Sequence, residues 1–186
     1  MTARPSPADP ALRDAARDLT SEVRRAVESV PDPELPPVTV GNLGMLHELH
    51  VDEAGHVEVE LLPTFSGCPA TDVIREDVED VVARIPGVTD VEVRFRFDPP
   101  WTPERIDADG RERLREFGIT PPGEVVEALE GLSERLQLPL QPVTLRPCPY
   151  CGSEDTISDS DFGPTPCRSV HFCRECMQPF EAFKAL

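Results

Sequence analysis

Hydrophobic residues in the first 30 positions recur every three to four residues, from Leu12 to Val30. This spacing predicts an amphipathic helix, and Asp9 followed by Pro10 suits its cap and its first turn. Four prolines within positions 31–37 end the pattern, because a residue that precedes proline avoids helical backbone angles. Residues 1–10 contain three prolines and are expected to form a disordered lead-in.

The next segments switch between helical spacing and strict alternation of apolar and polar residues. Alternation predicts strands with one buried face. The expected elements after the first helix are strands near Met45–Asp52 and Val57–Leu62, a helix near Ala70–Arg84, a strand over Val91–Phe97 and a short helix near Gly110–Phe117. This α-β-β-α-β-α order predicts a small α+β domain over residues 11–122.

The patterning changes twice after residue 122. Residues 123–146 keep apolar side chains at helical spacing among acidic ones, which predicts an acidic helical connector. Its apolar stripe is expected to pack on its own protein, with the binding of a partner as the alternative. Residues 147–186 contain few hydrophobic positions and five of the six cysteines. A segment this short and poor in core residues needs a further source of folding energy.

Four of these cysteines form two Cys-x-x-Cys pairs, Cys148 with Cys151 and Cys173 with Cys176, with 21 residues between them. Each pair turns sharply, so that its two sulfurs face one tetrahedral site. We predict a four-cysteine zinc ribbon over residues 147–186, with the four thiolates as structural ligands. Iron in a rubredoxin-like site would use the same ligands. Because a closed four-sulfur site has no open coordination position, we expect no catalysis there.

Cys167 and His171 lie just before the second pair. Either residue is able to displace an assigned ligand. Neither has a partner at Cys-x-x-Cys spacing, however, so both are left out of the predicted metal ligands. Cys167 is expected to be a packed or accessory thiol rather than a ligand. In the closing segment, Phe180 and Phe183 are expected to form the small core of the ribbon.

Cys68 stands apart from the other cysteines, between the alternating segment Val57–Leu62 and the helix expected near Ala70–Arg84. Gly67 permits a tight turn, and Pro69 suits the first position of the helix, where no N–H is needed. A thiol near a helix N-terminus is favoured in its thiolate form. The alternative is a small buried cysteine that only packs.

Composition excludes several classes of function. The chain has 35 acidic and 18 basic residues and a net charge of −17, so it lacks the attraction to phosphates on which nucleic-acid binding depends. No apolar run is long enough to span a bilayer, and no signal core precedes the first helix. We therefore expect a cytoplasmic protein with no membrane or nucleic-acid partner. In that compartment six cysteines indicate metal ligands or reactive thiols rather than disulfides.

The chain also lacks the residue patterns of an oxidising enzyme. Its four histidines are scattered, and none completes the paired Glu-x-x-His motifs of a di-iron oxygenase. No glycine-rich loop for a dinucleotide follows a predicted strand. The sequence thus predicts a protein that is not catalytic by itself, without catalytic residues of its own.

Several motifs resemble the MIP18-type (DUF59) domain of iron–sulfur assembly proteins, namely Asp32–Pro36, Asn42–Met45, Pro63–Ala70 and Pro99–Thr102. The match becomes more specific through two further segments, residues 118–122 and the tail from Phe162 to Lys184. A DUF59 domain joined to this ribbon is similar to the family of D subunits of phenylacetyl-CoA 1,2-epoxidase systems.

The resemblance implies an accessory subunit in aerobic phenylacetate catabolism that assists the assembly or maturation of iron or iron–sulfur centres. Its implied partners are the oxygenase and reductase components of the epoxidase, and a homodimer is compatible with this role. The alternatives are a structural interaction protein without metal transfer and a general iron–sulfur cluster assembly factor.

The resemblance also implies that Cys68 is a transient ligand for iron or an iron–sulfur cluster. Thr64 and Gly67 would support it from the same loop. Asp32 and Glu34, in a loop made stiff by prolines, are candidates for helping to hold an ion near Cys68. The simpler interpretation is that Asp32 caps a turn and Glu34 lies on the surface.

Overall fold

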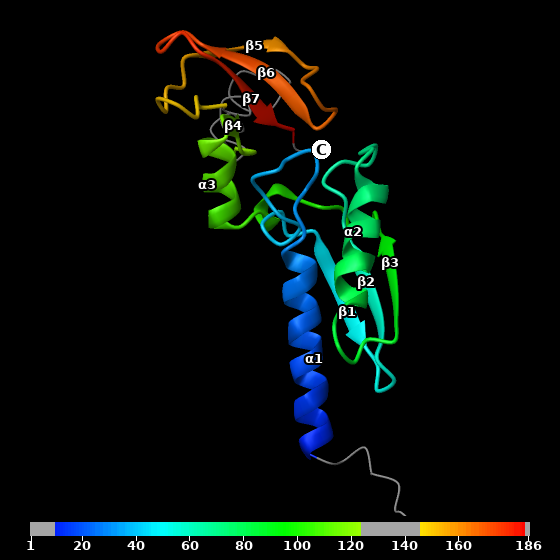
Figure 1. The fold of residues 1–186 in the computed structure, drawn as a ribbon. Coiled ribbons are helices and arrows are strands. Elements are labelled where there is room, and N and C mark those ends of the chain that lie inside the picture. The colour runs from blue at the N-terminus through cyan, green and yellow to red at the C-terminus, as the bar shows by residue number, and fades with distance from the viewer. Residues whose placement is uncertain (1–9, 124–145, 185–186) are drawn as a thin grey trace, which may run out of the picture. The chain divides into compact units, whose positions relative to one another are not determined.

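A computed structural model of the chain describes residues 10–123 and 146–184. The elements are α1 (Pro10–Glu28), β1 (Leu46–Val51), β2 (His56–Leu61), α2 (Thr71–Ala83), β3 (Asp90–Phe95), the short 3-10 helix η1 (Pro103–Arg105), α3 (Ala108–Glu116), β4 (Ile119–Thr120), β5 (Thr156–Ser160), β6 (Arg168–Cys173) and β7 (Pro179–Phe183) (Figure 1). They form two compact units, which meet in the sequence between Gly110 and Arg111. The α+β class and the order of the first six predicted elements are confirmed.

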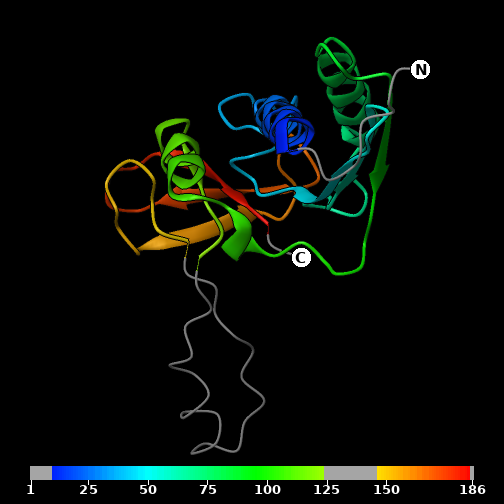
Figure 2. The same cartoon turned by 90° about the horizontal axis from the view of Figure 1, so that it is seen from below.

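The N-terminal unit contains a three-stranded sheet in the order β1-β2-β3. β1 and β2 form an antiparallel pair, whereas β2 and β3 run parallel and are connected through α2. Helix α1 contacts β1 and α2, and α2 contacts β3. Figure 2 shows the two helices beside each other over this sheet.

The core of this unit follows the periodicity of the sequence. Every second residue of β2 is buried, and so is about one residue per helical turn of α2 and of residues 18–28 of α1. The buried residues of these three elements include Val57, Val59, Leu61, Val23, Val27, Ile74, Val78 and Val82. Such residues remove apolar surface from water on folding and supply the main stabilisation of the unit.

The third strand is shorter than the sequence predicts. β3 ends at Phe95, and Phe97 is 59% exposed instead of buried. The N–H of Arg96 still donates to the carbonyl of Leu61 at 2.8 Å, but two of the next residues are prolines and have no N–H to extend the ladder. The buried aromatic residue of this region is instead Trp101, whose Nε1 donates to the carbonyl of Leu43 at 2.7 Å.

The C-terminal unit contains a four-stranded sheet in the order β4-β7-β6-β5. β5, β6 and β7 pair antiparallel, and β4 pairs parallel with β7. Ile119 and Thr120 thus belong to the same sheet as the ribbon, although the predicted connector separates them from it in the sequence. Most of that connector, residues 124–145, and the lead-in over 1–9 lie outside the described residues. The predicted domain limits stay a prediction.

The sequence was expected to contain no apolar run long enough to span a bilayer. Within residues 10–123 and 146–184, no helix combines the length and the apolar character needed to cross a membrane.

Candidate functional site

The two Cys-x-x-Cys pairs lie in matching turns of the C-terminal unit. In the first turn, the N–H of Cys148 donates to Ser153 O and that of Gly152 donates to Cys148 O, both at 2.9 Å. In the second, the N–H of Cys173 donates to Gln178 O at 3.0 Å. The residue after each second cysteine has a positive φ, 74° at Gly152 and 58° at Met177. This left-handed backbone turns both sulfurs of each pair toward one point.

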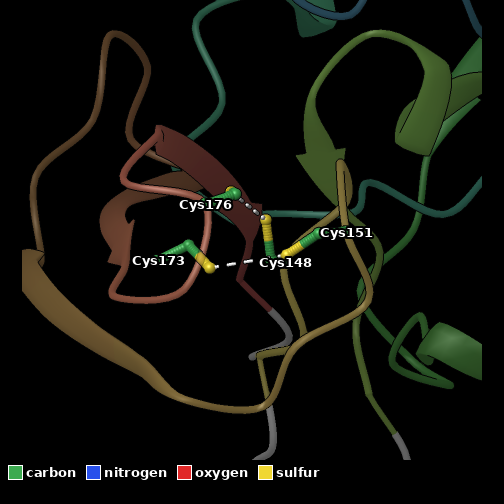
Figure 3. A group of neighbouring side chains, drawn as sticks. All are labelled: Cys148, Cys151, Cys173 and Cys176. Atoms are coloured by element: carbon green, nitrogen blue, oxygen red, sulfur yellow. Dashed lines mark hydrogen bonds between the residues drawn. The ribbon is translucent and has the colours of Figure 1, made fainter.

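The four sulfurs converge, as Figure 3 shows. All four Sγ atoms lie within 4.8 Å of one another. Cys148 Sγ is 3.6 Å from Cys176 Sγ, and Cys151 Sγ is 3.6 Å from Cys173 Sγ. Sulfurs bound at about 2.3 Å to one tetrahedral ion would lie about 3.8 Å apart. The donor set and its spacing therefore fit a four-sulfur metal site.

The thiols of this cluster differ in their affinity for protons. The N–H of Cys176 donates to the Cys173 sulfur and, with further hydrogen bonds, lowers the pKa of Cys173 to about 7. Burial, followed by the neighbouring sulfurs, raises the pKa of Cys176 to about 12. Four thiolates this close repel one another, so full deprotonation requires a cation among them. The arrangement is thus suited to a divalent metal ion.

The sulfurs form part of the small core of the ribbon. Cys148, Cys173 and Phe180 are buried together, and Cys176 packs against them. Phe180 thus belongs to the core of the ribbon as predicted, and Phe183 of the same strand is fully buried as well. Because three of the four side chains in this cluster are cysteines of the sulfur group, the packing of the core and the placement of the sulfurs depend on each other.

Cys167 and His171 lie outside the sulfur cluster. Cys167 is buried, with its Sγ 3.1 Å from Thr165 Oγ1. His171 Nε2 lies 2.9 Å from Ser169 Oγ, and its ring stacks on Phe180 with 5.4 Å between centroids. Burial and the positive charge of Arg146 lower the pKa of His171. The neutral imidazole thus has a structural role in the ribbon.

Cys68 is half-buried on the loop that connects β2 and α2. Its N–H donates to Phe65 O at 3.1 Å, and its carbonyl accepts the Thr71 hydroxyl at 3.1 Å. Helix α2 begins at Thr71 with Ala70 as its cap, so the expectation that Pro69 occupies the first helical position is wrong. The N–H of Ile74 donates to the carbonyl of Ala70, four residues earlier, and this is the hydrogen bond with which the helix begins. Ala70 is therefore the cap, and the helix starts after it. Cys68 therefore precedes the helix and lies within a separate turn.

The rest of this loop combines buried anchors with an exposed tip. Pro63 and Thr64 are buried, whereas Ser66 and Gly67 are exposed. Gly67 makes room for its neighbour, because a Cβ there would lie 3.3 Å from the ring of Phe65. The loop thus presents its thiol next to a solvent-exposed turn.

The side chain of Asp32 caps the turn in which it lies. This side chain is buried, and Oδ1 accepts the N–H of Glu34 at 2.8 Å and that of Leu35 at 3.0 Å. These contacts are those of a turn cap. Among the described residues, Cys68 does not belong to any group of three His, Cys, Asp or Glu ligands within 4.8 Å. The structure therefore does not bring Asp32 and Glu34 together with Cys68 into one ion site.

One further group of potential ligands is not apparent in the sequence. The atoms of His47, Glu48 and Glu60 lie within 4.8 Å of one another, because the pairing of β1 with β2 shifts register between Leu46 and Glu48. Arg96 donates to Glu60 at 2.9 Å and supplies a counter-charge. The cluster is thus a charge network on the surface of the sheet. Only the strand register reveals it.

Two family models match the sequence. The model "Iron-sulfur cluster assembly protein" matches residues 20–95, and the model "PaaD zinc beta ribbon domain" matches residues 138–184. The first match contains the loop with Cys68, and the second contains all four clustered cysteines.

Curated relatives and a solved structure agree with these matches. A putative 1,2-phenylacetyl-CoA epoxidase D subunit of Escherichia coli (strain K12) is 36% identical over 165 residues, which cover 89% of this chain and 92% of the relative. An Fe-S protein maturation auxiliary factor, YitW of Bacillus subtilis (strain 168), is 35% identical over 88 residues, covering 47% of this chain and 85% of the relative. A DUF59 domain of unknown function from Bacillus anthracis superposes with a TM-score of 0.51 at 29% identity, covering 55% of this chain and 96% of that chain.

Proposed function

The chain belongs to the family of 1,2-phenylacetyl-CoA epoxidase D subunits, and on this premise we propose that it is an accessory protein for the assembly of iron or iron–sulfur centres in such an epoxidase system. One observation carries the proposal. The match to iron–sulfur assembly proteins, over residues 20–95, contains a half-buried cysteine next to an exposed turn. The four cysteines of the ribbon are grouped elsewhere.

The two kinds of thiol have different roles in this proposal. Cys148, Cys151, Cys173 and Cys176 hold one zinc ion, which stabilises the ribbon and leaves no open coordination position. Cys68 is the thiol that contacts iron or a cluster in transit. Iron–sulfur clusters in proteins are commonly held by about four cysteine thiolates, so a single thiol does not hold one firmly. Weak ligation suits delivery better than storage.

The remaining ligands for an ion in transit come from a second molecule. Its candidates are the oxygenase or reductase component that receives the iron, or a second copy of the chain that contributes its own Cys68. The ribbon serves as a docking module for the recipient protein, since a net charge of −17 disfavours nucleic acid.

The decisive experiment compares Cys68→Ser with Cys167→Ser during co-expression with the epoxidase components. We expect Cys68→Ser to lower the iron content and the activity of the recipient severalfold, with about one zinc per chain retained. Cys167→Ser is the matched control, because its thiol is buried and lies outside the cluster. Equal iron content with wild type and Cys68→Ser would exclude the role of Cys68 and favour a purely structural interaction protein.

A second measurement separates the epoxidase-specific role from that of a general assembly factor, which the similarity to maturation factors favours. The same cells contain unrelated iron–sulfur enzymes whose activity reports general cluster supply. A loss confined to the epoxidase components supports the specific role. An equal loss in the unrelated enzymes indicates a general factor.

A further inference from the structure

The edge strand β4 belongs to the ribbon in space but not in sequence. Its two residues, Ile119 and Thr120, pair in parallel with Glu181 and Ala182 of β7. The N–H of Glu181 also donates to the carbonyl of Gly118 at 3.2 Å. A two-residue strand is too short to be stable by itself, so its position depends on the surfaces that flank it.

One of these surfaces is the first metal-binding turn. Tyr150 lies between the ligands Cys148 and Cys151 in sequence, and its hydroxyl approaches Gly118 so closely that a Cβ there would come within 2.5 Å. Glycine is required at position 118 for a second reason, since its φ is 81°. The aromatic ring of the metal-binding turn therefore lies directly against the residue that precedes β4.

A hydrogen bond connects the same two segments. The hydroxyl of Thr120 donates to the carbonyl of Pro147 at 2.7 Å, and Pro147 immediately precedes the ligand Cys148. Thr120 is buried, so loss of this bond would leave a buried polar group without its partner. The backbone next to the first ligand thus holds β4 from one side.

The second surface is β7, and it also depends on the sulfurs. Phe180 of β7 is buried with Cys148 and Cys173 in the small core of the ribbon. Two residues later, Ala182 pairs with Thr120. Both neighbours of β4 are therefore positioned by residues that ligate the metal or pack on its ligands.

Elsewhere the contact between α3 and the metal-binding turn is loose. A cavity of about 590 Å³ is lined by residues of both, among them Arg111, Arg115, Pro147 and Cys148. Arg111 donates to the carbonyl of Pro122 at 3.0 Å, a bond that joins residues 118–122 to α3 and not to the ribbon. Docking of β4 on the ribbon then depends on the order of the metal-binding turn and of β7.

We propose that the metal ion in the four-cysteine site acts as a clamp on residues 118–122: with the ion bound they dock on the ribbon, and without it they are released. Because α3 ends at Glu116, two residues before Gly118, release also frees the C-terminal end of α3. The inference rests on the metal site of the proposed function and not on the chemistry of Cys68. It makes metal occupancy of the ribbon a conformational control on the chain that precedes the connector.

Hydrogen exchange of the full-length protein tests the clamp, with the protein compared as zinc-loaded, chelated and reloaded. We expect peptides covering residues 118–122 to exchange more than about tenfold faster after chelation and to recover after zinc is restored. Peptides covering β2 are the internal reference and should stay within about twofold. Unchanged protection of residues 118–122 in the metal-free protein would overturn the proposal.

Two variants distinguish the clamp from general unfolding of the ribbon. Tyr150→Ala and Thr120→Val each remove one contact but no ligand, and should accelerate exchange in residues 118–122 about tenfold with zinc still bound. Phe162→Ala is the matched control, because this aromatic residue of the same unit is 85% exposed. The clamp would be refuted if residues 118–122 exchanged at the rate of the Phe162→Ala control in both variants. That outcome would not affect the Cys68→Ser experiment, which tests the proposed function.

Discussion

The two sheets of this protein are stabilised by different means. The sheet of the N-terminal unit is covered by two helices whose apolar faces bury Val23, Val27, Ile74, Val78 and Val82. The sheet of the C-terminal unit has a core in which Cys148 and Cys173 pack with Phe180. Apolar burial stabilises the first sheet, whereas in the proposed function the second sheet also needs a metal ion among its four clustered cysteines. The proposed function divides in the same way, because Cys68 belongs to the N-terminal unit and the four clustered cysteines belong to the C-terminal unit.

The largest expected effect comes from removing one ligand of the ribbon. Cys173→Ser should abolish stoichiometric metal binding and unfold the C-terminal unit, because structural zinc supplies apparent binding energies of about 10–16 kcal/mol at neutral pH. The N-terminal unit should keep its fold. Native mass spectrometry measures the metal, and the dispersion of amide signals in NMR spectra reports each unit.

The control for this loss is Cys167→Ser, which lies outside the sulfur cluster and should retain one ion per chain. If Cys173→Ser leaves the ribbon folded, the proposed difference between the two units is wrong.

A core substitution in the N-terminal unit should lower the stability of that unit and leave the metal content unchanged. Val78→Ala removes two buried methyl groups from α2 and should lower the free energy of unfolding of this unit by about 2 kcal/mol without changing the metal content. Val73→Ala, on the same helix, changes a side chain that is 45% exposed and should cost less than about 0.5 kcal/mol. Urea denaturation of both variants measures the difference. Comparable losses would show that the packing of α2 does not stabilise the unit.

Lowering the pH from neutral should weaken metal binding by the four clustered cysteines of the C-terminal unit. The pKa of Cys176 is raised to about 12, so this thiol must lose a proton when the ion binds. Protons therefore compete with the metal, and its apparent affinity should fall about tenfold per pH unit for each proton displaced as the pH decreases. Once the pH drops below about 7, the Cys173 thiol also becomes protonated and the dependence steepens. Competition with a chromophoric chelator between about pH 6 and 8 measures the slope, and a flat profile would contradict the thiolate site.

The smallest expected effect concerns Asp32. In Asp32→Asn the side-chain oxygen can still accept the N–H groups of Glu34 and Leu35, so stability should fall by less than about 1 kcal/mol. Alkylation of Cys68 and iron delivery should match the wild type. A severalfold loss of iron delivery at unchanged stability would restore the alternative in which Asp32 assists Cys68.

The order of the elements and the clustering of the four ribbon cysteines followed from the sequence because both signals are local. Helical spacing in α1 and α2 and alternation in β2 arise within one segment, where the neighbours along the chain decide which face is buried. Two residues between paired cysteines suffice to direct their sulfurs to one point. The spacing of Cys148, Cys151, Cys173 and Cys176 was therefore enough to predict the cluster.

Other features depended on contacts between segments far apart in the sequence. The pairing of β4 with β7 joins Thr120 to Ala182, and a two-residue strand has no periodicity by which to detect it. The register shift in β1 that brings His47 near Glu60 exists only in the paired sheet. Likewise, only the folded turn shows that the Asp32 carboxylate already accepts two backbone N–H groups. Local periodicity and cysteine spacing thus predicted the elements and the sulfur cluster, whereas long-range pairing decided which segments join the sheet of the ribbon.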